Sequence, residues 1–206
     1  MKIDNINLIK NILNFEKDGD FYYCLILKRK KDQPEEERDN HQSVRTIKTY
    51  CIESLEYLDK RYEEMKMLCE VFSARAYIHV QKQNHHLISL EMIEQLAKRL
   101  KSGVVRQNHL FDSVVGQIPF EERRWIVDVD SKDKEQLDKV IFFINNECRP
   151  LDTDKVIETI PTKNGYHLIT SKFDVITFKE KYSEVEIQKK NPTLLYFPDS
   201  LDLLKS

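Results

Sequence analysis

The chain has few of the residues that break a protein into loops or fibres. Only 4 of its 206 residues are glycine, and no proline-rich, serine-rich or repeated stretch interrupts it. With 40% hydrophobic and 33% charged residues, the composition excludes a disordered or fibrous protein. A chain of this length can bury a full core, so we expect one compact body made of one large domain or two small units.

Paired cysteines and long apolar runs are also missing. The four cysteines lie far apart without a CxxC pair, so neither a disulfide framework nor a structural zinc site is indicated. No window approaches the roughly 20 apolar residues that a membrane span requires. We therefore expect a soluble, cytoplasmic protein without membrane contact.

An excess of positive charge is absent as well, because the formal net charge is -2. A polynucleotide partner would therefore have to be held by local basic patches. Candidate patches are residues 28–31, the Arg123–Arg124 pair and the Lys189–Lys190 pair. Clusters of this kind are more often solvated surface.

Hydrophobic periodicity predicts an N-terminal α/β subdomain in residues 1–118. Helices are expected at residues 3–13, 54–72 and 90–102. Strands are expected at residues 21–28, 43–52 and 74–80, with a charged loop at 29–42. Ser89 is the expected cap of the third helix. The residues of that helix expected to face inward are Leu90, Ile93, Leu96, Ala97 and Leu100.

In the remaining residues, 119–206, the hydrophobic pattern and the turn signals predict the element order βαββαβ. Its expected elements are a strand at 125–130, a helix from Ser131 to about residue 148, strands at 155–162 and 166–171, a helix at 175–182 and a last strand or hairpin at 185–197. The two middle strands meet across Lys163-Asn164-Gly165, and Asn-Gly is a strong hairpin signal. The predicted fold class is therefore α/β (α+β), with an RRM-like βαββαβ palm packed on the N-terminal unit.

Asp128 and Asp130 are the main candidates for chemistry. Side chains alternate along a strand, so the two carboxylates share one face. That arrangement costs several kcal/mol unless a cation or a proton offsets it. Mg²⁺ suits two such aspartates, because it takes oxygen ligands and is completed by water and substrate phosphates, and the chemistry would be two-metal phosphoryl transfer. Alternatively, Asp130 is a helix N-terminal charge beside Ser131 while Asp128 pairs with Arg123 or Arg124.

His167 is the second candidate, because the predicted hairpin can bring it beside the aspartate strand. There the imidazole, nearby backbone amides and Lys163 would meet the phosphates of a nucleotide. The alternative is a half-buried histidine bonded to backbone. No metal is assigned to the other histidines, which are His41, His79, His85, His86 and His109.

Two segments, residues 125–130 (WIVDVD) and 162–167 (TKNGYH), resemble the first two motifs of the archaeo-eukaryotic primase superfamily, the primase-polymerases. The resemblance covers about residues 123–197 in a minimal form of that catalytic core. It implies that Asp128 and Asp130 hold the catalytic metals, Mg²⁺ or Mn²⁺. It also implies that His167 contacts the nucleotide phosphates, with Lys163 and Gly165 beside it.

The family's third motif, an apolar residue followed by an acid on a later strand, has no unambiguous copy here. Glu186 is the residue chosen for it, as a catalytic and metal-binding carboxylate in place of the usual aspartate. Gly165 stands where the family often has a small hydroxyl residue. These departures place polymerase activity in question more than metal binding.

The resemblance implies a DNA primase-like or polymerase-like nucleotidyltransferase. The expected partners are nucleoside triphosphates, a single-stranded DNA or RNA template and a replication helicase. One alternative is a metal-dependent nuclease or phosphohydrolase that uses the same aspartates, with His167 as base or phosphate ligand. The other is a non-catalytic RRM-like module that binds nucleic acid or a replication partner.

Overall fold

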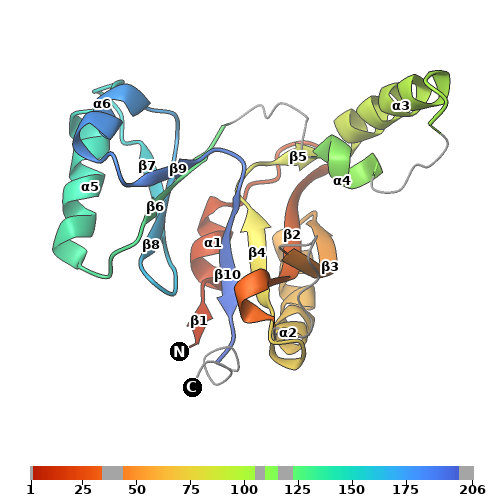
Figure 1. The fold of residues 1–206 in the computed structure, drawn as a ribbon, viewed down its shortest axis with the longest axis horizontal. Coiled ribbons are helices and arrows are strands. Elements are labelled where there is room, and N and C mark those ends of the chain that lie inside the picture. The colour runs from red at the N-terminus through yellow and green to blue at the C-terminus, as the bar shows by residue number, and fades with distance from the viewer. Residues whose placement is uncertain (1, 34–43, 105–109, 116–122, 200–206) are drawn as a thin grey trace.

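The computed structural model describes residues 2–33, 44–104, 110–115 and 123–199. Over these residues the protein is a mixed α+β chain with two antiparallel sheets and six α-helices (Figure 1), which confirms the coarse fold class. Within the same ranges, no helix has the length and hydropathy needed to cross a membrane. The predicted subdomain boundary at 118/119, as well as His41 and His109, lies outside the described residues.

The first sheet combines both ends of the chain. Its strands lie in the order β1 (Ile3–Asp4), β10 (Pro192–Phe197), β4 (Arg75–His79), β2 (Asp20–Arg29) and β3 (Val44–Ile52), and β5 (Gln83–Asn84) pairs with β2. Helices α1 (Ile6–Ile12) and α2 (Leu55–Val71) pack on one face of this sheet through a shared apolar core. A short 3₁₀ turn, η1 (Lys30–Asp32), follows β2 at the start of the predicted charged loop.

The second sheet has the order β7 (Val156–Pro161), β8 (Tyr166–Thr170), β6 (Trp125–Val129) and β9 (Glu186–Gln188). Helices α5 (Lys134–Asn146) and α6 (Val175–Lys181) follow β6 and β8 and cover its outer face (Figure 1). The chain order β6-α5-β7-β8-α6-β9 agrees with the six elements predicted for this half. The first five predicted elements form here with boundaries shifted by a few residues, whereas the last strand is shorter than predicted.

Strand β6 is buried on both faces, and its alternation decides where the acidic side chains point. Val127 and Val129 pack with α5 and α6, whereas Ile126 joins the core that includes α1 and the first sheet. Because residues two apart on a strand share a face, Asp128 points toward the first sheet. The predicted alternation is confirmed.

The last strand differs from the prediction. Residues 185–197 do not form one strand or hairpin of the second sheet, because β9 ends at Gln188 and β10 crosses into the first sheet between β1 and β4. The consecutive residues Leu195, Tyr196 and Phe197 are 0%, 1% and 0% exposed. Such an uninterrupted apolar run requires cover on both faces, and the middle of the first sheet supplies it.

Helix α3 (His85–Lys101) also differs from the prediction. Asn84 caps it by accepting a hydrogen bond from the His86 amide, so the helix begins at His85 and Ser89 lies inside it. Leu90, Ile93 and Leu100 are 53%, 66% and 57% exposed and Ala97 is exposed, so the predicted inward face is wrong except at Leu96. The helix instead buries Ile88, together with half-buried Met92 and Leu96, against β2 and α4 (Leu110–Val115).

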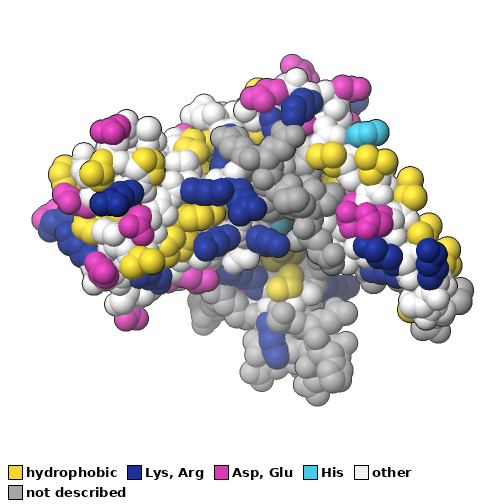
Figure 2. Space-filling model, turned by 90° about the horizontal axis from the view of Figure 1, so that it is seen from above, with side chains coloured by type: hydrophobic (Ala, Val, Ile, Leu, Met, Phe, Trp, Pro, Cys, Tyr) yellow, Lys and Arg dark blue, Asp and Glu magenta, His cyan; other side chains and the backbone are white. Residues whose placement is uncertain are grey.

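The reason lies in the position of α3, which projects from the body of the protein and which the described residues cover on one side (Figure 1). Figure 2 shows hydrophobic side chains along this arm. Its apolar residues occupy more than one face, so the sequence pattern alone does not select the face that packs.

Candidate functional site

Three predicted site residues form a row across the second sheet. In the antiparallel register, Asp128 on β6 lies directly opposite His167 on β8 and directly opposite Glu186 on β9. Residues directly opposite in a sheet project from the same face, with their Cβ atoms about 4.5–5.5 Å apart. The sheet therefore brings the three side chains together on the surface that faces the first sheet.

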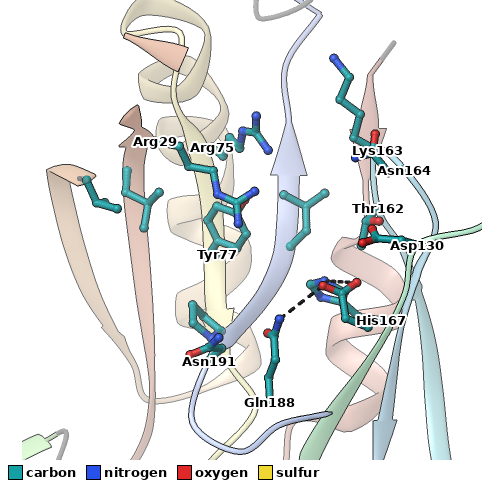
Figure 3. Close-up of a pocket in the computed structure, with 15 residues that line it drawn as sticks. Arg29, Arg75, Tyr77, Asp130, Thr162, Lys163, Asn164, His167, Gln188 and Asn191 are labelled. Atoms are coloured by element: carbon teal, nitrogen blue, oxygen red, sulfur yellow. Dashed lines mark hydrogen bonds and ion pairs between the residues drawn. The ribbon is translucent and has the colours of Figure 1, made fainter. Parts of the chain in front are cut away.

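His167 is held between the two sheets. Its Nε2 atom lies 3.5 Å from Asp128 Oδ1, and its Nδ1 atom lies 2.9 Å from the hydroxyl of Thr193, a fully buried residue of β10. The Gln188 amide donates a hydrogen bond to the other Asp128 oxygen, at 3.3 Å (Figure 3). The side chains of His167 and Asp128 are 12% and 21% exposed, so both groups are largely withdrawn from water.

Burial moves the pKa values of this pair in opposite directions. It raises the pKa of Asp128 to about 6, and the negative charges of Asp130 and Glu186 contribute to that rise. It lowers the pKa of His167 to about 4, and the positive charge of Arg29 contributes to that decrease. At neutral pH the carboxylate is therefore ionised and the imidazole is neutral.

The alternative roles of the aspartates are not observed. Asp133, not Ser131, caps α5 by accepting a hydrogen bond from the Glu135 amide, so Asp130 is not a charge in the first helical turn. Arg124 is buried and donates to the carbonyl of Ile12. Among the described residues, neither aspartate has an ion pair with lysine or arginine, and the side-chain contacts of Asp128 are with a histidine and an amide.

The β7–β8 hairpin approaches the end of β6 very closely. A Cβ atom added at Gly165 would lie 1.9 Å from the carbonyl oxygen of Val129 and 2.7 Å from the amide nitrogen of Ser131. The Gly165 amide donates to the Thr162 hydroxyl at 3.1 Å, and the Thr162 amide donates to the Gly165 carbonyl at 2.8 Å. Gly165 thus allows the hairpin to pack beside the aspartates, and its predicted contact with a nucleotide stays a prediction.

A cavity of about 260 Å³ lies between the two sheets. The second sheet contributes Asp128, Asp130 and His167, and the hairpin tip contributes Thr162, Lys163 and Asn164. The first sheet supplies the opposite wall, which includes Leu27, Arg29, Arg75, Tyr77 and Leu194 (Figure 3). The two aspartates therefore lie on one wall, with Lys163 at its hairpin tip, and the opposite wall combines arginines with apolar side chains.

The cationic side chains of the cavity differ in how they are held. Arg75 is 4% exposed and forms a buried ion pair with Asp32, at 2.7 Å. The Lys163 ammonium lies 5.3 Å from the centre of the Phe197 ring. The Arg29 guanidinium lies over the ring of Tyr77, 5.7 Å from its centre.

Several cavity residues are not among the predicted site residues. The sequence places Arg29 only in a general basic patch and Tyr77 only in the strand expected at residues 74–80, and it gives no signal for Gln188. It also gives no signal for Thr193, which contacts His167. The alternation from Leu27 to Arg29 on β2 does show that they share a face. Nothing in the sequence shows that this face lies opposite β6.

Glu186 adjoins the site without lining the cavity. Its side chain is exposed, although its charge acts on Asp128. In the part of the chain that the structure describes, no group of three or more His, Cys, Asp or Glu side chains is positioned to hold a metal ion. The predicted ligand set of Asp128, Asp130 and Glu186 therefore stays a prediction.

Some side chains of the predicted basic patches are buried or contact other residues. Lys189 lies over the Trp125 ring, 5.0 Å from its centre, while Arg124 is buried. Figure 2 shows Lys and Arg side chains gathered near the middle of the face seen from above. A local concentration of positive charge is thus present on a chain whose net charge is slightly negative.

Comparison of the chain with protein-family models, with curated proteins and with solved structures gives no match. Inference about function therefore depends on the motifs and on the geometry of the site itself.

Proposed function

We propose that the protein is a minimal nucleotidyltransferase of the primase-polymerase kind, which forms phosphodiester bonds from nucleoside triphosphates on a single-stranded template. The observation that carries the proposal is the pairing of Asp128 with His167 at a cavity that Asp130 also lines. A metal-bound polyphosphate requires carboxylates for the metal and donors or cations for the phosphates. The cavity offers both.

The arrangement of the second sheet supports the same proposal. The strand order β7-β8-β6-β9, with α5 and α6 on one face, supports the interpretation of this half as a split βαβ or RRM-like palm. In this interpretation Asp128 lies on a central strand, and the face opposite the helices is the catalytic face. One fold can serve many activities, so the proposal depends on the residues of the site.

Asp128 and Asp130 fit a divalent metal, because they share a face and lack cationic partners among the described residues. Mg²⁺ or Mn²⁺ is often held by one or two carboxylates and otherwise by water and substrate phosphates. Glu186, across from Asp128 on β9, is the third carboxylate of the proposed set. When bound, such an ion would neutralise phosphate charge and orient the reacting oxygens.

The other residues of the site would position the nucleotide. Thr193 orients the His167 ring, whose pKa near 4 keeps it neutral, so that the imidazole can donate one hydrogen bond to a phosphate oxygen. Lys163 at the hairpin tip adds positive charge. Gln188 orients the Asp128 carboxylate, which is ionised above about pH 6. The template would lie along exposed basic residues such as Lys189.

A template-directed synthesis assay tests the proposal. Labelled ribonucleoside or deoxyribonucleoside triphosphates would be incubated with single-stranded DNA and Mg²⁺ or Mn²⁺. Asp128→Ala and Asp130→Ala should reduce product to background, whereas Asp133→Ala, a nearby carboxylate outside the cavity, should retain most of it. Absence of product with either metal, or product that persists in Asp128→Ala, would contradict the proposal. Cleavage of the DNA without extension would identify a nuclease instead.

A second candidate is a nucleotide-binding or nucleic-acid-binding module without catalysis. The observation that favours it is the exposed position of Glu186, which leaves two carboxylates in the cavity. Both candidates predict that Mn²⁺ with a nucleoside triphosphate raises the unfolding temperature, because ligands that bind the native state stabilise it. Only the enzyme would also release pyrophosphate in the presence of template.

A further inference from the structure

Arg29 occupies a position that the aspartate and histidine motifs do not explain. It is the last residue of β2, in the first sheet, and its side chain extends into the cavity that contains Asp128 and His167 (Figure 3). Tyr77, on the neighbouring strand β4, lies beneath the guanidinium, with 5.7 Å between the guanidinium carbon and the ring centre. The cation therefore rests on a nearly buried aromatic face.

The guanidinium of Arg29 is not held by a carboxylate of the described residues. Among the described residues its side chain forms no hydrogen bond and no ion pair, and the aromatic ring that it contacts is that of Tyr77. Arg75, the other arginine of this wall, is buried and paired with Asp32 at 2.7 and 2.8 Å. Arg75 thus has a structural partner, whereas Arg29 presents its donors to the cavity.

Arg29 also lies close enough to act on the opposite wall. Its positive charge opposes the rise in the pKa of Asp128 and contributes to the lowered pKa of His167. Asp128 and His167 belong to the second sheet and Arg29 to the first, so this electrostatic interaction acts across the cavity. A ligand that lies against Asp128 and His167 would therefore meet Arg29 from the other side.

We propose that Arg29, supported by the ring of Tyr77, binds the triphosphate of the incoming nucleotide from the first sheet. A guanidinium presents a planar fork of donors that matches phosphate oxygens, and stacking on an aromatic ring orients that fork. Leu27 and Leu194 line the same wall of the cavity, and Arg29 itself is exposed to solvent. The nucleotide in this inference is the one named by the proposed function.

Binding measurements with inorganic tripolyphosphate and with ATP, each with Mn²⁺, test the inference by titration calorimetry. Arg29→Gln should weaken both ligands by about tenfold to hundredfold, the effect of losing hydrogen bonds to a charged group. Arg29→Lys should restore part of the affinity, since it keeps the charge but loses the fork. Tyr77→Leu should weaken binding less than Arg29→Gln does, because it keeps the charge and removes only its support.

Lys30→Gln is the matched control, because it removes one positive charge at the next position from a side chain that does not line the cavity. It should change the affinity by less than about twofold, as expected for an exposed charge. Thermal unfolding of each variant checks that the fold is intact. Tripolyphosphate binding that is equal in wild type, Arg29→Gln and Lys30→Gln overturns the inference, as does a wild type that binds neither ligand.

The assay for synthesis separates this inference from the proposed function. A wild type that binds triphosphate through Arg29 but makes no polymer contradicts the proposed function and leaves the inference standing. A wild type that makes polymer, with an unchanged KM for nucleotide in Arg29→Gln, overturns the inference and leaves the proposed function standing.

Discussion

Gly165 shows how closely the two motif-bearing strands approach each other. A Cβ atom at this position would lie 1.9 Å from the Val129 carbonyl oxygen, which is far inside van der Waals contact. The obstacle is backbone, which cannot rotate away as a side chain can. The spacing between the hairpin and the aspartate strand therefore depends on the absence of a side chain at this position.

Gly165→Ala should lower the free energy of unfolding by about 1–3 kcal/mol or more, the usual effect of overpacking, and should also reduce synthesis. Urea denaturation measures the change. Gly103→Ala is the control, because Gly103 has a φ of 79° with open space around its Cβ position, so only left-handed strain of about 1–2 kcal/mol is expected. An alanine at 165 that is tolerated better than one at 103 would contradict the steric explanation.

Asp128 and His167 should give the stability of the protein two opposing pH dependences. The folded-state pKa of Asp128 is raised from 3.8 to about 6, so its contribution is present below pH 3.8 and is lost as the pH rises through about 6. The folded-state pKa of His167 is lowered from 6.5 to about 4, so its contribution is present above pH 6.5 and is lost as the pH falls through about 4. In the wild type the two effects largely offset each other between pH 4 and 6.5.

Single substitutions should separate the two effects. Relative to wild type, Asp128→Asn should gain stability as the pH rises from 4 to 6.5, and His167→Asn should lose stability over pH 4 to 6, each on the order of 2–3 kcal/mol. Urea denaturation at intervals across this range measures the slopes. If both variants keep the wild-type slope, the pair is not titrating as the structure indicates.

The sequence could predict one wall of the site but not the other. Alternation along residues 125–130 places the aspartates on one face, and the hairpin signal places His167 on a neighbouring strand. Arg29 and Tyr77 belong to the other sheet, which meets this one through tertiary packing alone. No local sequence pattern predicts how the two sheets pack against each other. The positions of Arg29 and Tyr77 in the cavity are therefore known only from the structure.

Helix α3 shows a limit of the same kind. Its apolar residues occur at too many positions to define one buried face, and the choice is made by contact with β2 and α4. The starts of α3 and α5 also differ from the prediction, because the sequence alone does not decide which polar residue caps a helix. Asn84 and Asp133 cap helices for which the sequence predicts Ser89 and Ser131, and these residue types have nearly equal capping preference.

The two faces of α3 should respond differently to truncation. Ile88→Ala should lower the free energy of unfolding by about 2–4 kcal/mol, because Ile88 is 1% exposed within an apolar cluster. Ile93→Ala removes the same atoms from a side chain that is 66% exposed, so a change within about 0.5 kcal/mol is expected. Chemical denaturation of the two variants compares them directly, and a larger loss for Ile93→Ala would contradict the observed face.

Strand β10 joins the two ends of the chain into one sheet. It pairs with β1 on one side and β4 on the other, and its residues Leu195 and Phe197 are fully buried. The N-terminal subdomain predicted for residues 1–118 lacks this strand. Its sheet would therefore be divided between β1 and β4, with apolar surface exposed on both sides of the gap.

A fragment of residues 1–118 should accordingly fail to show a cooperative unfolding transition, because it cannot complete the first sheet. Circular dichroism during thermal unfolding measures this. The same fragment with residues 190–199 fused through a flexible linker is the control, and it should regain a transition. Cooperative unfolding of the unfused fragment would show that the subdomain is independent of β10.

The short connection between β9 and β10 ties the opposing walls of the cavity together. Only three residues separate Gln188, which touches Asp128, from Pro192, which lines the other side. The four residue steps from Gln188 to Pro192 reach at most about 13–14 Å, and the hydrogen bond between Thr193 and His167 crosses the same gap. This connection therefore limits how far the two walls of the cavity can separate at the end where Gln188 and Pro192 lie.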